Sequence, residues 1–206
     1  RFDAGPVAAE AFEVKAEAEQ VRVITAVDNQ LMTGETIVDT PVADGHAVPD
    51  PERDVLKLAV VNRYEDAEPA VAFIQGFGLD TGALASSVAH DSHNVVAVGA
   101  SDDALAQAVN AVIEKEGGIS AVDGDDEHIL PLPVAGLISD RPYDEVARRY
   151  TVLSTFVQNE LGSPMDAPFM TLSFMALLVI PQLKLSDKGL FDGESFSFAD
   201  RFVIER

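Results

Sequence analysis

The sequence predicts an α/β or α+β fold, in which a mixed sheet packs against two or three helices. Short apolar runs of strand length alternate with two amphipathic helical segments along the 206 residues. Hydrophobic residues make up 47% of the chain, which is enough for a buried core at this length. The length suits one domain, or one domain plus an arm, and the sequence contains no internal repeat or low-complexity tract.

The first 50 residues are rich in Ala, Glu and Asp. Apolar and polar side chains alternate there only at residues 21–27, which predicts one strand. Residues 40–53 carry three prolines and a glycine, which predicts a loop. We therefore expect an acidic arm with one strand over residues 1–50 and the main domain over residues 51–206.

Strands and turns alternate in the next part of the chain. Residues 56–61 predict a second strand and residues 71–74 a third. The glycine-rich run at residues 76–82 matches neither the phosphate-binding loop nor the dinucleotide fingerprint, so we interpret it as a turn that needs glycine dihedrals. Two short apolar segments follow, at residues 85–89 and 95–98.

Residues 101–116 form the clearest predicted helix. Ser101 is a natural N-cap, and Gly117 opens a pair of glycines that ends the helix. A strand is expected directly after it, at residues 119–122. The residues of its apolar face recur at spacings of three and four, and they are Leu105, Ala108, Val109, Val112 and Ile113.

A second helix is predicted to begin near Pro142, because proline suits the first turn, and to end at Gly162. Its expected apolar face consists of Val146, Tyr150, Leu153, Val157 and Leu161. Residues 169–180 are interpreted as a buried core segment that is too short to span a bilayer. Alternating apolar residues from Phe196 to Ile204 predict one or two late strands.

Acidic residues outnumber basic residues by 35 to 14, which gives a formal net charge of −21. This charge repels phosphate groups, so we expect neither nucleic-acid nor anionic-membrane partners. The acidic residues are spread along the chain. This pattern favours a protein from a high-salt cytoplasm, where screening weakens self-repulsion, over an ordinary acidic surface.

The absence of cysteine excludes disulfides, thiolate zinc sites and a cysteine nucleophile, and it fits a reducing cytoplasm. The first residues contain no apolar run of the kind that a signal peptide needs. Because the chain does not begin with methionine, we expect it to be a piece of a longer cytoplasmic protein.

Residues 90–94 are the sharpest candidate for a functional site. His90, Asp91 and His93 place two imidazoles and a carboxylate close together, and these groups are common ligands of zinc, iron and manganese. In an extended strand, positions i and i+3 point to opposite faces, so both histidines bind one metal only if the backbone turns here. The chain has only 4 histidines, so we expect no complete metal site within it.

The loop has two further interpretations. Asp91 and Asn94 could order a turn through hydrogen bonds, with the histidines as ordinary polar residues. Alternatively, a rigid scaffold could present the loop to the active site of another domain, and we favour this interpretation. Ser86 and Ser87 precede the loop and are candidates for substrate binding. The chain has no GxSxG motif, so a serine nucleophile has little support.

Several longer motifs carry a resemblance to a known family. They are residues 76–79 (GFGL), 82–94 (GALASSVAHDSHN), 130–137 (LPLPVAGL), 168–174 (PFMTLSF) and 180–190 (IPQLKLSDKGL). In these motifs and in their order, the chain resembles the carboxy-terminal domain of adenine deaminases, which belong to the amidohydrolase superfamily. The resemblance covers roughly residues 53–191, and the first 50 residues match poorly apart from their strand.

The resemblance implies an enzyme that converts adenine to hypoxanthine and ammonia, in which a metal-bound hydroxide attacks the ring carbon that bears the amino group. It also implies a binuclear manganese or iron site on a (β/α)8 barrel, held by an HxH pair, further histidines and an aspartate. This chain contains no HxH pair and is too short to hold such a barrel as well. The barrel domain, its metals and the catalytic acid are therefore expected outside this chain. The candidate active-site residues within it are His90, Asp91, His93 and Asn94.

Two alternatives stay open. One is a stand-alone, non-catalytic binding or assembly domain of the same fold, which can form a homo-oligomer. The other is an independent metallohydrolase that uses His90, Asp91 and His93. A preceding coding segment with an HxH pair favours the adenine deaminase, whereas stoichiometric metal in the isolated chain favours the metallohydrolase.

Overall fold

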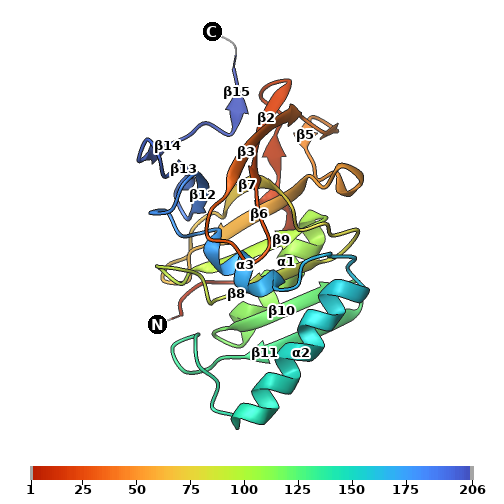
Figure 1. Cartoon of the computed structure of the whole chain (residues 1–206), viewed down its shortest axis with the longest axis vertical. Coiled ribbons are helices and arrows are strands. Elements are labelled where there is room, and N and C mark those ends of the chain that lie inside the picture. The colour runs from red at the N-terminus through yellow and green to blue at the C-terminus, as the bar shows by residue number, and fades with distance from the viewer. Residues whose placement is uncertain (1, 205–206) are drawn as a thin grey trace.

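The computed structural model describes residues 2–204, which are built around one large mixed sheet (Figure 1). Its strands are β2 (Gln20–Thr25), β3 (Gly34–Asp39), β6 (Leu56–Val61), β7 (Ala70–Gln75), β8 (Ala83–Ser86), β9 (Val95–Gly99), β10 (Gly118–Asp123), β11 (Asp126–Pro131) and β15 (Phe202–Val203). They lie in the order β11-β10-β8-β9-β6-β7-β2-β15, and β3 also pairs with β2. The pairing of β2 with β7 is parallel, and the other pairings of this sheet are antiparallel. The predicted mixed sheet is confirmed, and the described residues form no (β/α)8 barrel.

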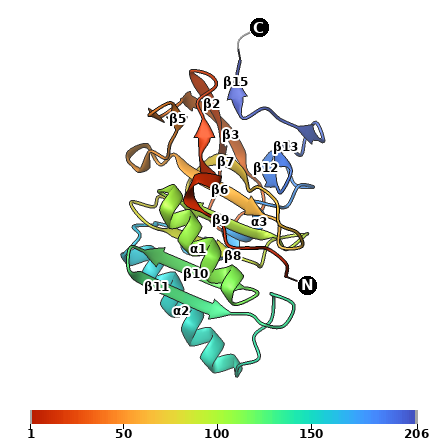
Figure 2. The ribbon, with the colours of Figure 1, turned by 180° about the vertical axis from the view of Figure 1, so that it is seen from behind.

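Helices cover both faces of this sheet (Figures 1 and 2). On one face lie α1 (Asp102–Glu114) and the short 3-10 helix η1 (Ala9–Phe12). On the other face lie α2 (Tyr143–Asn159), α3 (Pro168–Phe174) and a small sheet of β12 (Leu183–Ser186), β13 (Gly189–Asp192) and β14 (Ser197–Phe198). Alternate residues of a strand point to opposite faces, so each face has its own buried cluster. In β6, for example, Leu58 belongs to the α2–α3 side and Ala59 to the α1 side.

The two long helices begin and end close to the residues that the sequence predicts. The backbone N–H of Ala104 donates to Ser101 Oγ at 3.1 Å, which caps the first turn of α1. Pro142 directly precedes α2, and Gly162 follows its end with a φ of +86°. The left-handed region favours glycine, which explains why the helix stops there. Over residues 2–204, no helix is both long and apolar enough to cross a lipid bilayer.

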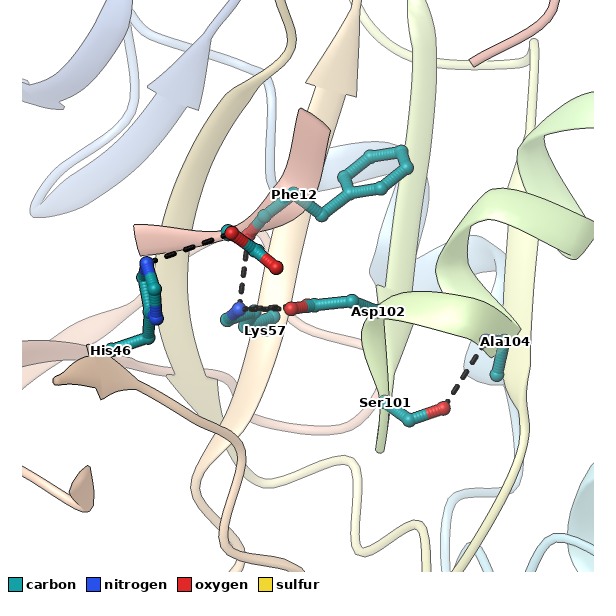
Figure 3. A network of polar contacts seen from close by, with 7 residues as sticks. Phe12, His46, Lys57, Ser101, Asp102 and Ala104 are labelled. Atoms are coloured by element: carbon teal, nitrogen blue, oxygen red, sulfur yellow. Dashed lines mark hydrogen bonds and ion pairs between the residues drawn. The ribbon is translucent and has the colours of Figure 1, made fainter. Parts of the chain in front are cut away.

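A buried ion pair links β6, η1 and α1 (Figure 3). Lys57 Nζ lies 2.7 and 2.8 Å from the two carboxylate oxygens of Asp102 and also donates to the carbonyl of Phe12 at 2.9 Å. The Lys57 side chain is fully buried, and burial lowers its pKa while it raises the pKa of Asp102. The pair therefore fixes the start of α1 and the amino-terminal segment to the centre of the sheet.

The expectation of one strand before residue 50 is wrong. The structure has five, because β1 (Val14–Lys15), β4 (Val42–Ala43) and β5 (His46–Ala47) form a small sheet beside β2 and β3. The predicted loop at residues 40–53 contains two of these short strands and the 3-10 helix η2 (Pro51–Arg53). Strands of two residues, such as β1, β4 and β5, are too short to produce an alternation of apolar and polar residues in the sequence.

Other elements also differ from the sequence predictions. β11 follows the acidic turn after β10 and is not predicted by the sequence. Its six residues begin with Asp, Glu and His and end with Pro, so only two of them are apolar strand formers. Residues 169–180, interpreted as a core segment, form α3 and the turns that follow it; Phe169, Leu172 and Met175 do lie in the core, whereas Val179 is exposed. The hairpin of β12 and β13 was missed as well, whereas the late strands of the tail are confirmed as β14 and β15.

Candidate active-site loop

The loop at residues 87–94 connects two central strands of the large sheet. β8 and β9 are antiparallel neighbours, so their connection is a hairpin loop at one end of the sheet. The sequence places the polar residues of this loop between two apolar segments, and the structure confirms that position. The loop therefore has a rigid scaffold on both sides.

His93 closes the loop with both its backbone and its ring. Its N–H donates to the carbonyl of Ala89 at 2.7 Å, and the N–H of Ala89 donates to His93 Nδ1 at 3.3 Å. The backbone of His93 has a φ of +55°, in the left-handed region. The turn that two histidines would need to approach each other is thus present, and the two ring centroids lie 5.7 Å apart.

His90 packs against α3. Its N–H donates to the carbonyl of Ser173 at 3.1 Å, and its ring lies edge-on to Phe174 with centroids 5.8 Å apart. Its Nδ1 atom is buried and has no hydrogen-bond partner among the described residues. Buried polar atoms normally have a partner, so this nitrogen is an unsatisfied polar group at the candidate site.

Asp91 and Asn94 have different environments. Asn94 is 2% exposed, and its Oδ1 accepts a hydrogen bond from the backbone N–H of Arg63 at 3.3 Å. Asp91 is exposed and makes no hydrogen bond to the described residues. The turn-ordering role that the sequence assigned to Asp91 and Asn94 therefore belongs to Asn94 and His93.

Arg63 was not selected from the sequence, yet it joins three loops at this end of the sheet. It is only 6% exposed, and its Nη1 donates to the carbonyl of Ala135 at 2.8 Å. Its Nη2 donates to the hydroxyl of Tyr64 at 3.1 Å, which in turn donates to the carbonyl of Ser92 at 2.6 Å. A signal was present, because Arg63 lies two residues after the fully buried strand β6 in a chain that is poor in basic residues.

Ser86 and Ser87, the candidates for substrate binding, are both buried. Ser86 Oγ accepts from the N–H of Val88 at 3.0 Å. Ser87 Oγ donates to the carbonyl of Gly136 at 2.6 Å and accepts from the N–H of Gly118 at 2.9 Å. Both hydroxyls are used within the chain, which favours a structural role for these serines.

The loop has a mixed electrostatic environment. The pKa of His93 is lowered, first by burial and then by the nearby His90 and Arg63, whereas Asp91 opposes this effect. Residues 2–204 contain no group of three or more His, Asp or Glu side chains that could hold a metal ion. The donor set at His90, Asp91 and His93 therefore does not fit a metal centre of its own, and the independent metallohydrolase has no support here.

The motifs around this loop belong to a described family. Residues 30–197 match the family model of the adenine deaminase C-terminal domain. The chain belongs to this family. The match begins at residue 30, so the family's domain includes β3 and the short strands β4 and β5.

Curated adenine deaminases match most of the chain. The adenine deaminase of Salinibacter ruber is 72% identical over 204 residues, which cover 98% of this chain and 37% of that protein. Those of Parabacteroides distasonis and Methanosarcina mazei are 49% identical over 202 residues and 48% identical over 186 residues. The latter two matches cover 98% and 90% of this chain, and 37% and 33% of the relatives. The chain thus spans about a third of the length of the curated relatives it matches.

Proposed function

We propose that this chain is the C-terminal part of an enzyme that hydrolyses adenine to hypoxanthine and ammonia, and that its loop at residues 90–94 faces the active site of that enzyme. The observation that carries the proposal is the match of 98% of the chain to a protein named adenine deaminase at 72% identity. The chain covers 37% of that relative, so the remaining part of the enzyme has room for a catalytic domain.

The active-site role of the loop rests on its local features. Two imidazoles lie close together at the end of a rigid sheet, and His90 Nδ1 is buried with no partner among the described residues. Hydrogen bonds that involve Arg63, Tyr64 and Asn94 fix the backbone of the loop, and the imidazoles therefore project from a defined position. A preorganised polar loop of this kind is suited to bind part of a substrate.

The metal chemistry of the proposed reaction does not belong to this chain. Adenine deaminases of the amidohydrolase superfamily are expected to use a binuclear manganese or iron site to activate water. The described residues offer no donor set for it, so we place the metals on a barrel domain outside the chain and derive no step through them here. A cytoplasmic location, a role in purine salvage and adaptation to high salt are part of the same proposal.

An apolar groove beside α2 favours a second candidate, a binding or assembly domain. Only three of the 17 residues of α2 are buried, and Tyr143 at its start is 86% exposed. Apolar side chains line the groove between this helix and the segment before it, namely Leu132, Leu137, Ile138, Tyr143, Val146 and Tyr150. An unpartnered apolar surface of this kind is typical of an interface. Sedimentation velocity over a concentration series tests whether copies of the chain associate.

The catalytic assignment is tested with two proteins, this chain and the complete protein that contains it. Both are incubated with adenine, with and without added manganese, and hypoxanthine is measured by chromatography. We expect the complete protein to form hypoxanthine and the isolated chain to form none. Hypoxanthine formation by the isolated chain, or none by the complete protein with manganese present, contradicts the proposal.

A further inference from the structure

We propose that His93 is held as a neutral imidazole with its proton on Nε2, and that it presents this N–H as a hydrogen-bond donor to an acceptor atom of the molecule bound at the loop. The identity of that molecule, a neutral heteroaromatic ring with lone pairs on nitrogen or oxygen, rests on the proposed function. The form of the imidazole rests on the geometry of the loop alone.

The Nδ1 atom of His93 is an acceptor because its partner can only donate. That partner is the backbone N–H of Ala89, 3.3 Å away. A neutral imidazole has one nitrogen that accepts and one that carries the proton, so acceptance at Nδ1 places the proton on Nε2. A doubly protonated ring would turn two N–H groups toward each other and lose this contact.

The backbone keeps the ring in this position. The N–H of His93 donates to the carbonyl of Ala89 at 2.7 Å, so the two residues are joined at both backbone and side chain. The φ of His93 is +55°, a conformation that costs a residue with a Cβ about 1 kcal/mol or more. Glycine would meet this φ without strain. Glycine would therefore form this turn more easily, and the side chain of His93 adds a ring held in a fixed position.

The surroundings of His93 favour the neutral form. Burial is the first cause of its lowered pKa, and the neighbouring His90 and the guanidinium of Arg63, from the loop after β6, act in the same direction. Asp91, in the same loop, is the one group that opposes them among the causes of this shift. The contacts of the loop with α3 are made by His90, and its partners there, Ser173 and Phe174, are uncharged. At neutral pH the ring thus carries one proton.

The donor is free to meet a ligand. His93 is partly exposed, and its Nε2 makes no hydrogen bond within residues 2–204 and is not among the buried atoms without a partner. A neutral N–H donor suits a ring nitrogen or a carbonyl oxygen; adenine offers ring nitrogens, and its deaminated product offers ring nitrogens and a carbonyl oxygen. His93 is therefore a binding residue that donates a proton in a hydrogen bond, and it does not act as a general base.

The form of the imidazole is tested in this chain by long-range ¹H–¹⁵N NMR at pH 7. We expect the Nδ1 resonance of His93 at the position of an unprotonated nitrogen and its Nε2 resonance at that of a protonated one. The half-buried His46 is the internal reference, and a His93→Gln variant assigns the signals. A proton on Nδ1, or on both nitrogens, overturns the inference whether or not the complete enzyme is active.

The use of the donor is tested in the complete enzyme with His93→Gln and His93→Leu. The glutamine amide keeps a donor near the Nε2 position but cannot act as a base, whereas leucine keeps neither. We expect His93→Gln to retain at least about tenfold more kcat/KM than His93→Leu, which is the size expected for one hydrogen bond. We expect its pH profile to match that of the unmodified enzyme. Equal losses in both variants overturn the donor role, and melting curves correct each rate for the folded fraction.

Discussion

The hydroxyl of Tyr64 donates to the carbonyl of Ser92 at 2.6 Å, so a side chain from the loop after β6 holds the middle of the candidate active-site loop. The same hydroxyl accepts from Arg63 Nη2 at 3.1 Å. The loop therefore depends on a network that begins at a buried arginine, and its position is set by residues that lie about 30 positions earlier in the chain.

The first prediction concerns this network. Tyr64→Phe removes the hydrogen bond to Ser92 and leaves the ring in place, so the free energy of unfolding should fall by about 1 kcal/mol. Amide hydrogen exchange should quicken at residues 92–94, because the loop loses its support. Tyr143→Phe is the matched control, since Tyr143 is 86% exposed and should show neither effect. Unchanged exchange in the Tyr64 variant would show that the hydroxyl does not position the loop.

The second prediction concerns the buried ion pair of Lys57 and Asp102. Lys57→Met leaves the carboxylate without its partner, so the variant should lose about 3 kcal/mol of stability. Combining Lys57→Met with Asp102→Leu should cost less than the sum of the two single changes, because both charges are removed together. Glu145→Gln, which breaks an exposed pair with Arg149, should cost less than about 1 kcal/mol. Urea unfolding of the four variants gives these values, and additive costs for Lys57 and Asp102 would argue against the coupling.

The third prediction is a pH dependence of stability that arises from Lys184. Its ammonium group is buried in β12, donates to the carbonyl of Leu31 at 2.6 Å and has its pKa lowered by burial to about 8. Because this pKa lies below the ordinary value of 10.5, the unfolded state binds more protons between about pH 8 and pH 10.5. Burial of the charged Lys184 ammonium therefore destabilises the folded state fully below pH 8. This destabilisation decreases as the pH rises across the window, so the free energy of unfolding increases.

Lys184→Met should consequently stabilise the fold at pH 7 by about 2 kcal/mol, after the loss of the bond to Leu31 is taken into account. This gain should shrink as the pH rises to 10. Urea unfolding at several pH values measures the difference from the unmodified chain, and the exposed Lys188→Met is the control. A destabilised variant at pH 7, or a gain that does not depend on pH, contradicts the assignment.

The fourth prediction concerns salt. The formal charge of −21 repels itself in the folded state, and salt screens this repulsion. The melting temperature should therefore increase as sodium chloride rises from low to molar concentration. A melting temperature that stays flat or falls over this range would show that self-repulsion does not limit the stability of this fold.

Much of the central fold is predictable from the sequence, because its elements carry strong periodicity. The apolar spacing of α1 and the apolar residues of β6, interrupted only by Lys57, each reflect a buried environment, and the structure contains both elements. The strands that were missed lack this signal. β3 alternates between partly buried and exposed residues, and β11 begins with exposed acidic residues. Their formation depends on pairing with β2 and β10, which is a tertiary effect.

The candidate site is predictable only in part. The position of the loop follows from polar residues between two apolar segments, but its internal contacts do not follow from sequence spacing. Arg63 reaches the loop only because β6 and β9 are neighbours in the sheet. Ser86 and Ser87 look accessible beside a polar loop, yet the chain folds over them and uses their hydroxyls. Burial of this kind is decided by segments that are distant in the sequence.

The most direct test of the proposed active-site role measures two single variants of the complete enzyme, His90→Ala and His93→Ala. His90→Ala removes the edge-on contact with Phe174 but no side-chain hydrogen bond within residues 2–204, so it should cost about 1 kcal/mol of stability. His93→Ala should cost about 1 kcal/mol more, because the contact with Ala89 is lost. His46→Ala, on β5, is the control.

Turnover is measured per folded molecule for the three variants, with the folded fraction taken from melting curves. We expect both loop variants to lose about tenfold or more in kcat/KM, and the His46 variant to keep the rate of the unmodified enzyme. If the activity of the loop variants follows their folded fraction alone, the loop at residues 90–94 is only a turn, and the proposed active-site role is wrong.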